Sequence, residues 1–177
     1  MKTQIATSRQ LLTLGFAAIA PVWLSSQTVL AQNSASVVIA GTVSAALKIT
    51  ATTAPDLTST ELVDGVTDKM MSTVNEKCNK HDGYTVTLKS ENAAAATSTQ
   101  AFLTGSISAN TDKILYSIKY NGNLITLGSS GVATVTDSSV KTGGQGDDKY
   151  LLISIAPNQN PPADVYSDTL VLTIAAK

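Results

Sequence analysis

The chain has 177 residues, with 12 basic and 13 acidic side chains, a formal net charge of −1 and a single cysteine. No cluster of basic residues stands out, so the sequence does not indicate a surface that binds nucleic acid. One cysteine excludes a disulfide within the chain and leaves two alternatives for Cys78: a buried thiol or a bond to another chain.

The first 31 residues have the pattern of a secretory signal peptide. Lys2 and Arg9 form a basic head, an apolar run covers Leu11 to Ala20, and Val29 and Ala31 occupy the small-residue cleavage positions. The alternative is an uncleaved membrane anchor, which Pro21 and the polar Ser25–Thr28 disfavour. We expect cleavage after Ala31, which leaves residues 32–177 as one secreted domain of ordinary size.

Most of the remaining chain reads as β-strand. An extended stretch from Ser36 to Thr50 has Val37, Ile39, Val43, Ala45, Leu47 and Ile49 at odd positions, with Gly41 among them. Further strands are predicted over 84–89, 113–120, 124–127, 131–136, 150–155 and 166–174, with a hairpin turn at Asn121-Gly122. Residues 52–60, 141–149 and 156–164 are rich in turn formers, and residues 90–100 suit either a loop or one helical turn. The pattern predicts an all-β fold, an antiparallel β-sandwich.

The stretch from Ser36 to Thr50 is longer than the strands of such domains, because fifteen extended residues span roughly 50 Å at about 3.3 Å each. Either the chain bends at Gly41 and both halves belong to the same domain, or residues 34–42 project and pair elsewhere. The last strand poses the complementary question, since the chain ends soon after it. If Val37, Ile39, Gly41 and Val43 of one copy lie beside the last strand of another, both strands are completed and an open filament forms.

Two further groups of residues have side chains that can bind metals or take part in catalysis. Cys78 and His81 lie three residues apart, but two ligands do not make a zinc site, and a turn before the strand at Tyr84 is the favoured interpretation. Asp147 and Asp148 lack the spaced acidic residues of a calcium loop and are expected to be solvated. We therefore predict no catalytic residues, no metal and no cofactor. Tyr166 and Asp168 are expected to anchor the entry to the last strand by hydrogen bonds.

Three segments resemble the spore coat protein U domain family, which includes the archaic chaperone–usher pilins. "IAPNQNPPADVYSDTLVLTI" is similar to the C-terminal signature, in which Tyr166, Asp168, Thr169 and Leu170 match. "VVIAGTVSAALKI" resembles the N-terminal donor segment and first strand, and "VNEKCNKHDGYTVTLKS" resembles the central piece that carries a cysteine. The family's usual early cysteine is missing here, so Cys78 lacks the partner that the resemblance implies.

The resemblance implies an incomplete immunoglobulin-like antiparallel β-sandwich, which is completed by strand exchange. It divides the chain into a signal peptide at 1–31, a donor segment at 32–43 and a pilin-like domain at 44–177. Its donor residues would be Val37, Ile39, Gly41 and Val43, and its acceptor strand would carry Tyr166, Asp168, Leu170, Leu172 and Ile174. The implied partners are identical or related subunits, a periplasmic chaperone and an outer-membrane usher. The implied product is a fimbria on the cell surface that serves adhesion or biofilm formation. The alternative from the residues alone is a monomeric secreted binding module whose first strand completes its own sandwich.

Overall fold

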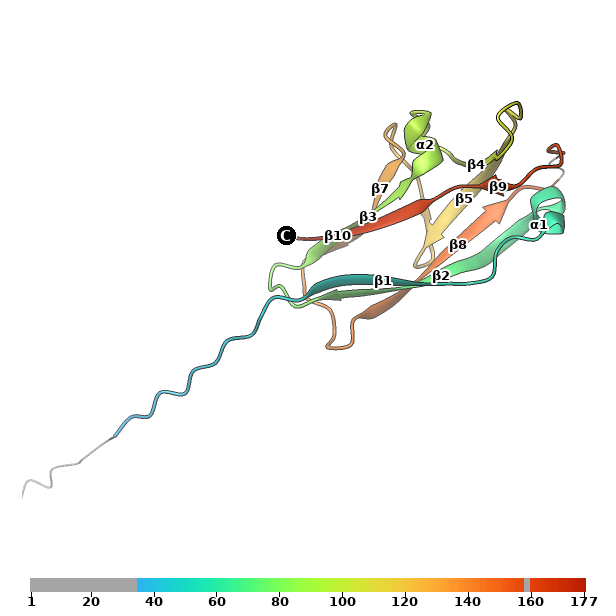
Figure 1. Ribbon diagram of the computed structural model, residues 1–177. Coiled ribbons are helices and arrows are strands. Elements are labelled where there is room, and N and C mark those ends of the chain that lie inside the picture. The colour runs from blue at the N-terminus through green and yellow to red at the C-terminus, as the bar shows by residue number, and fades with distance from the viewer. Residues whose placement is uncertain (1–34, 158–159) are drawn as a thin grey trace, which may run out of the picture. The chain divides into compact units, whose positions relative to one another are not determined.

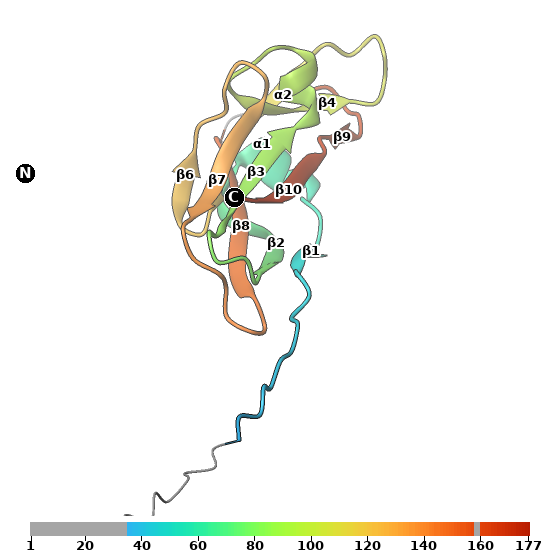
Figure 2. The same cartoon turned by 90° about the vertical axis from the view of Figure 1, so that its left-hand side faces the viewer.

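Two antiparallel sheets face each other in the computed structural model, which describes residues 35–157 and 160–177 (Figures 1 and 2). Its contacts divide the chain into two units, Met1–Gly41 and Thr42–Lys177, and the sandwich belongs to the second. The predicted signal peptide lies outside the described residues. In the described ranges, no helix is long and apolar enough to cross a membrane. The arrangement of the described strands in two facing antiparallel sheets confirms the predicted antiparallel β-sandwich.

The larger sheet has the strand order β1-β2-β8-β5-β4-β9, and β6 pairs with β5. Its strands are β1 (Leu47–Thr53), β2 (Val66–Cys78), β8 (Asp147–Ile155), β5 (Lys113–Tyr120), β6 (Asn123–Ile125), β4 (Ala101–Gly105) and β9 (Tyr166–Ser167). The smaller sheet has the order β10-β3-β7. Its strands are β10 (Leu170–Ala176), β3 (Tyr84–Ser90) and β7 (Val132–Ser138). Two short helices, α1 (Ser59–Asp64) and α2 (Glu91–Ala95), complete the described elements.

The core lies between the sheets and is built from alternate residues of the strands. On β5 the buried side chains are Ile114, Tyr116, Ile118 and Tyr120, as period-two alternation predicts. The hairpin between β5 and β6 turns at Asn121 (φ 49°) and Gly122 (φ 81°), both in the left-handed region that this type of two-residue turn requires. The alternation and the turn together set the register between β5 and β6.

Two predicted strands have different limits in the structure. The extended stretch predicted from Ser36 to Thr50 is strand only from Leu47 onward, because residues 35–46 have no neighbouring strand in the described chain. The predicted strand from 166 to 174 is interrupted at Asp168 and Thr169, so that β9 pairs with β4 and β10 pairs with β3. The interruption moves the chain from one sheet to the other.

Glu76 is a fully buried carboxylate on β2. Its Oε1 accepts hydrogen bonds from the hydroxyls of Tyr120 (2.6 Å) and Thr136 (2.8 Å), and its Oε2 accepts one from Tyr84 (2.9 Å). No buried side-chain nitrogen or oxygen lacks a hydrogen-bond partner in the part of the chain that the structure describes. Three hydroxyl donors thus replace the water that a buried carboxylate loses.

The buried tyrosines predict that the fold weakens at alkaline pH. Burial, and secondarily the hydrogen bonds to Glu76, raise the pKa of Tyr84 and of Tyr120 above the ordinary value of 10.0. Above about pH 10 the unfolded chain loses tyrosine protons that the folded chain keeps, so stability is full below that pH and falls as pH rises. Urea denaturation at about pH 8 and about pH 11 should show the lower midpoint at the higher pH, and Tyr120→Phe should reduce the difference. Equal midpoints would contradict this prediction.

Candidate functional site: an open groove between β1 and β10

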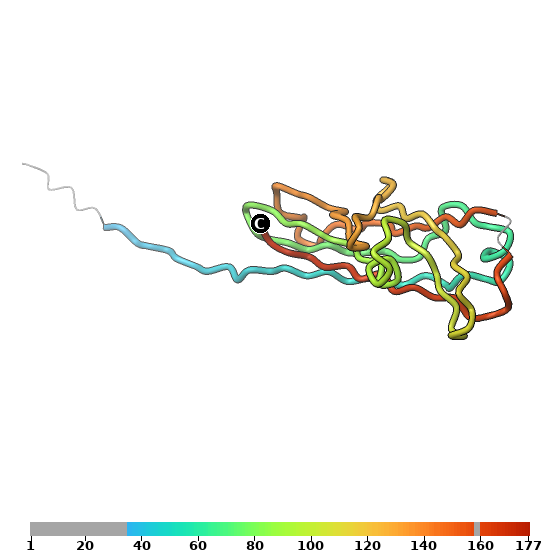
Figure 3. Tube along the Cα trace, turned by 90° about the horizontal axis from the view of Figure 1, so that it is seen from above, coloured from blue at the N-terminus to red at the C-terminus, as the bar shows by residue number. Residues whose placement is uncertain are grey.

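The edge strands β1 and β10 run side by side without pairing with each other (Figures 1 and 3), and we call the space between these two edges the gap. Among the strands of the described residues, β1 pairs with β2 alone and β10 pairs with β3 alone. An antiparallel strand exposes every second backbone N–H and C=O on the side away from its partner. Each edge therefore presents a row of unpaired backbone groups to the same gap.

The hydrogen bonds of β10 show which residues carry these free groups. The amide of Glu91 donates to the carbonyl of Thr169 (3.0 Å), and that of Lys177 donates to the carbonyl of Gly83 (3.3 Å). By alternation, odd-numbered residues of β10 bond to β3, and Leu170, Leu172 and Ile174 direct their backbone groups toward the gap. The same three side chains face the core and are only partly buried. β10 thus offers both backbone partners and apolar contacts to an additional strand.

β1 is arranged in the same way. The amide of Asn79 donates to the carbonyl of Ala46 (3.1 Å), and the amide of Ala54 donates to the carbonyl of Met71 (2.8 Å). These bonds place the even-numbered residues of β1 toward β2 and leave the odd-numbered ones, including Ile49 and Ala51, free on the other side. Ile49 is only partly buried, and Ala51 is exposed. The edge of the larger sheet is therefore as incomplete as that of the smaller sheet.

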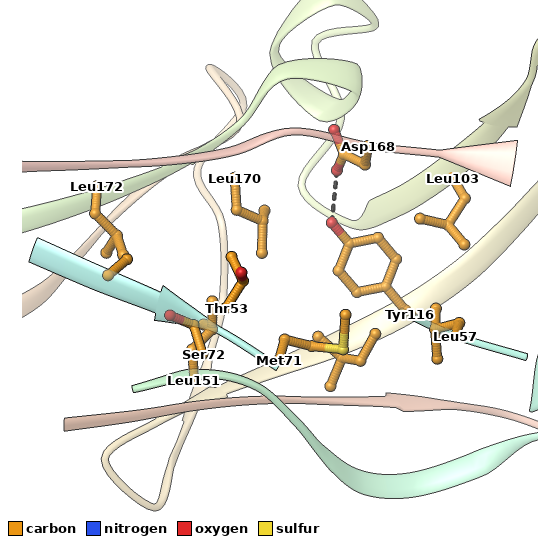
Figure 4. Close-up of a pocket in the computed structure, with 12 residues that line it drawn as sticks. Thr53, Leu57, Met71, Ser72, Leu103, Tyr116, Leu151, Asp168, Leu170 and Leu172 are labelled. Atoms are coloured by element: carbon orange, nitrogen blue, oxygen red, sulfur yellow. Dashed lines mark hydrogen bonds between the residues drawn. The ribbon is translucent and has the colours of Figure 1, made fainter. Parts of the chain in front are cut away.

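An apolar cavity of about 250 Å³ lies between the two edges (Figure 4). It is lined from β1 by Ala51 and Thr53, from β10 by Leu170 and Leu172, and from the floor by residues that include Met71, Leu151 and Ile153. A second cavity adjoins it near α1 and β9, and Leu57, Met71, Leu103 and Asp168 line both. We call these two cavities together the groove.

Asp168 lines both cavities and is hydrogen-bonded to Tyr116, and we call this polar pair between the two cavities the polar bar. The Oδ2 of Asp168 accepts hydrogen bonds from the hydroxyls of Tyr116 (2.5 Å) and Ser90 (2.6 Å), and its Oδ1 accepts from the amides of Asn92 (3.0 Å) and Thr169 (2.7 Å). Burial, followed by the hydrogen bond to Asp168, raises the pKa of Tyr116. Figure 4 shows the hydrogen bond between Tyr116 and Asp168 among the residues that line the first cavity. Asp168 holds the point at which the chain leaves β9 and enters β10.

Tyr166 lies in β9 and not in β10, the strand that holds Leu170, Leu172 and Ile174. Its hydroxyl donates to the carbonyl of Pro162 (3.0 Å) and accepts from the side-chain amide of Asn110 (2.8 Å). The expected hydrogen-bonding roles of Tyr166 and Asp168 are therefore observed, although only Leu170, Leu172 and Ile174 share a strand. The sequence did not reveal that β1 forms the opposite wall of the groove.

The residues predicted to act as donors are exposed. Val37, Ile39 and Val43 have relative exposures of 85%, 94% and 87%, and a Cβ added to Gly41 would meet no atom within 4 Å. Residues 35–46 carry no assigned secondary structure. This exposed apolar stretch has the alternation of a strand but has no strand partner in the described chain.

Cys78 and His81 lie in different environments, one buried and the other exposed to solvent. Cys78 is buried, and its sulfur lies 3.7 Å from the carbonyl oxygen of Gly83. His81 is exposed, and its Nδ1 lies 3.0 Å from a carboxylate oxygen of Asp82. Among the described residues, no group of three His, Cys, Asp or Glu side chains is placed to hold a metal ion. Asp148 accepts a hydrogen bond from the side-chain amide of Asn75 (2.7 Å).

No protein-family model matches the chain, and the curated proteins contain no match. Among solved structures, the crystal structure of SefD_dscA in D2O is similar over 75% of this chain and 98% of that chain, with 18% sequence identity and a TM-score of 0.35. Similarity this distant does not assign a function, which has to rest on the geometry of the chain itself.

Proposed function

We propose that this protein is a structural subunit of a surface filament, in which residues 32–43 of one copy fill the groove of the next. The observation that carries the proposal is the groove itself, with unpaired backbone on both walls and an apolar floor. Such an edge is an aggregation liability unless something covers it. The same chain carries a segment whose pattern fits the groove, so a second copy is the partner that the sequence supplies.

The apolar residues of the donor segment alternate in the way that the groove requires, so that all of them could face the core. An inserted strand antiparallel to β10 would place residues of one parity opposite Leu170, Leu172 and Ile174, facing the core. The odd-numbered donors Val37 and Ile39 would then enter the first cavity, and their burial would contribute roughly 1.5–3 kcal/mol each as an upper estimate. The backbone of the donor would bond to the free groups of β10.

In this alignment Gly41 would lie beside the Asp168–Tyr116 pair, where the two cavities adjoin. A residue without a side chain passes this polar bar without burying an apolar group against a carboxylate. Val43, two residues further on, would then reach the second cavity beside Leu57. The spacing of two apolar donors, one glycine and one further apolar donor thus corresponds to two cavities that are separated by a polar bar.

The direction of insertion predicts an open polymer. The N-terminal segment leads into β1 at Leu47. This first residue of β1 lies near the C-terminal end of β10 (Figure 1). A donor antiparallel to β10 would have its own domain at the opposite end of the acceptor. Successive subunits would therefore stack head to tail, and a contact of this kind builds filaments when it does not close into a ring.

The sequence resemblance supplies the rest of the proposed route. A signal peptide at 1–31 would deliver the chain to the periplasm, where a chaperone would cover the groove until an outer-membrane usher exchanges it for the next subunit. The resulting fimbria would serve adhesion or biofilm formation. No catalytic step is proposed for this chain.

A shortened chain tests the proposal. We expect a mature chain that lacks residues 34–41 to stay monomeric and to bind a synthetic peptide of residues 34–43, because the groove remains open. At a saturating concentration the peptide should raise the thermal midpoint by on the order of 5 °C. A Gly41→Leu peptide is the matched control and should bind more weakly, because its side chain meets the polar bar.

The alternative function makes the opposite prediction. If the chain is a self-contained binding module, the shortened chain should be a folded monomer whose thermal midpoint does not change with either peptide. That result would remove the groove as an acceptor site.

A further inference from the structure

The N-terminal segment enters β1 through a clamp made by the side chain of Asn79. Its Oδ1 accepts a hydrogen bond from the amide of Ala46 (2.7 Å), and its Nδ2 donates one to the carbonyl of Ser44 (2.8 Å). The backbone amide of Asn79 also donates to the carbonyl of Ala46 (3.1 Å). One residue therefore holds three backbone groups of the segment that precedes β1.

The clamp lies where the β1–β2 ladder ends. β2 ends at Cys78, and the chain then turns, with the amide of Gly83 donating to the carbonyl of Lys80 (3.3 Å). No backbone of β2 extends far enough to pair with Ser44, so the side-chain amide of Asn79 takes the place of the next ladder step. Ser44 and Ala46 are thereby held in line with β1 beyond the point where its partner stops.

This matters because the donor segment has two possible acceptors, its own groove and that of another copy. The free edge of β1 is open along its odd-numbered residues, so a hairpin at residues 44–46 would let the segment fold back onto it. A three-residue turn there would pair Val43 with Leu47 and carry Val37 opposite Thr53, which lines the first cavity. The odd-numbered donors would still face inward, so self-insertion would satisfy the same apolar contacts.

The clamp engages two of the three residues that such a turn needs. With Ser44 and Ala46 bonded to Asn79, the nearest turn of the same length falls at residues 41–43, before the clamp. Val37 would then lie opposite Leu47 and would not reach Ala51, the first residue of β1 that lines the cavity. Self-insertion after that turn would leave the cavity empty.

We infer that Asn79 is a positioning residue that keeps the donor segment out of its own groove and so favours donation to a second copy. This inference rests on the proposed function and concerns the control of the same groove. A residue that merely stabilised the end of β1 would affect the free energy of unfolding but would not change which groove the segment enters.

The experiment uses the full mature chain with Cys78→Ser and with cysteines introduced at Val37 and Thr53. In dilute protein, oxidation should trap the self-inserted form as a cross-linked monomer. We expect Asn79→Ala to raise the ratio of cross-linked monomer to polymer roughly tenfold, because two hydrogen bonds that oppose the turn are lost. Asn79→Asp should act in the same direction, because its second carboxylate oxygen cannot donate to the carbonyl of Ser44. Lys80→Ala, at the next exposed position of the same turn, is the matched control and should leave the ratio unchanged.

The outcomes separate the inference from the proposed function. A shift in both Asn79 variants but not in Lys80→Ala supports the inference. An unchanged ratio in Asn79→Asp, or a lower thermal midpoint without a change in the ratio, overturns it even when the shortened chain binds the 34–43 peptide. Failure of that peptide to bind the shortened chain would overturn the proposed function and this inference with it. If Asn79→Ala does not fold, Asn79→Asp alone decides.

Discussion

Ile39→Asp is expected to abolish polymer formation while leaving the domain folded. In the proposed filament the side chain at position 39 enters the apolar cavity beside Leu170 and Leu172 of the neighbouring copy. A carboxylate there would lose its water and gain no cationic partner, which costs several kcal/mol and reduces assembly by more than about 100-fold. Native gels and size-exclusion chromatography of the purified mature chain should show monomers only.

Val38→Asp is the matched control for this variant. Val38 is also exposed in the structure, at 88%, but its parity would place it on the outer face of an inserted strand. We expect Val38→Asp to polymerise much as the unchanged chain does. Equal loss of polymer in both variants would show that charge anywhere in the segment prevents assembly, and the proposed strand parity would be wrong.

Asp168→Ala is expected to lower the free energy of unfolding by about 3 kcal/mol or more. The variant removes the acceptor of four hydrogen bonds. Two buried donors, the hydroxyls of Ser90 and Tyr116, are then left without an acceptor. Each unsatisfied buried donor costs about 1–3 kcal/mol, and the sheet-switching point between β9 and β10 loses its anchor. Urea denaturation measured by circular dichroism gives the free energy directly.

Asp137→Ala provides the comparison, because Asp137 forms an exposed ion pair with Lys177. Exposed pairs contribute about 0–1 kcal/mol, so this variant should unfold close to the unchanged midpoint. If the free energy of unfolding falls no more in Asp168→Ala than in Asp137→Ala, Asp168 does not organise the entry to β10. In that case its place on both cavity walls would have no effect on stability.

The fold class was predictable because several strands carry clean local patterns. β3 and β5 bury one face with strict alternation, and Asn121-Gly122 requires a tight hairpin. Alternation and left-handed turn residues are properties of short segments and do not depend on what lies across the core. These segments could be read without any knowledge of their partners.

β2 was missed for the opposite reason. Its inward positions include two polar residues, Ser72 and Glu76. The Ser72 hydroxyl donates to the carbonyl of Thr52 on β1, and the Glu76 carboxylate accepts from hydroxyls such as that of Tyr120. A carboxylate at a core position looks like a loop residue until those donors are known. α1 begins with a capping box formed by Thr58 and Glu61, a local helix-start signal that lies within a turn-rich segment.

The candidate site divides in the same way. The alternating apolar residues Val37, Ile39 and Val43 and the apolar positions of β10 are local patterns, so the sequence alone determined them. The groove is not local, because β1 and β10 are separated by most of the chain and become neighbours only when two sheets pack face to face. The break at Asp168 likewise depends on Tyr116 and Ser90 converging from other strands. Side-chain periodicity thus indicated the strand-like pattern of residues 37–43, and only the packing of the sheets decided where a groove was left open.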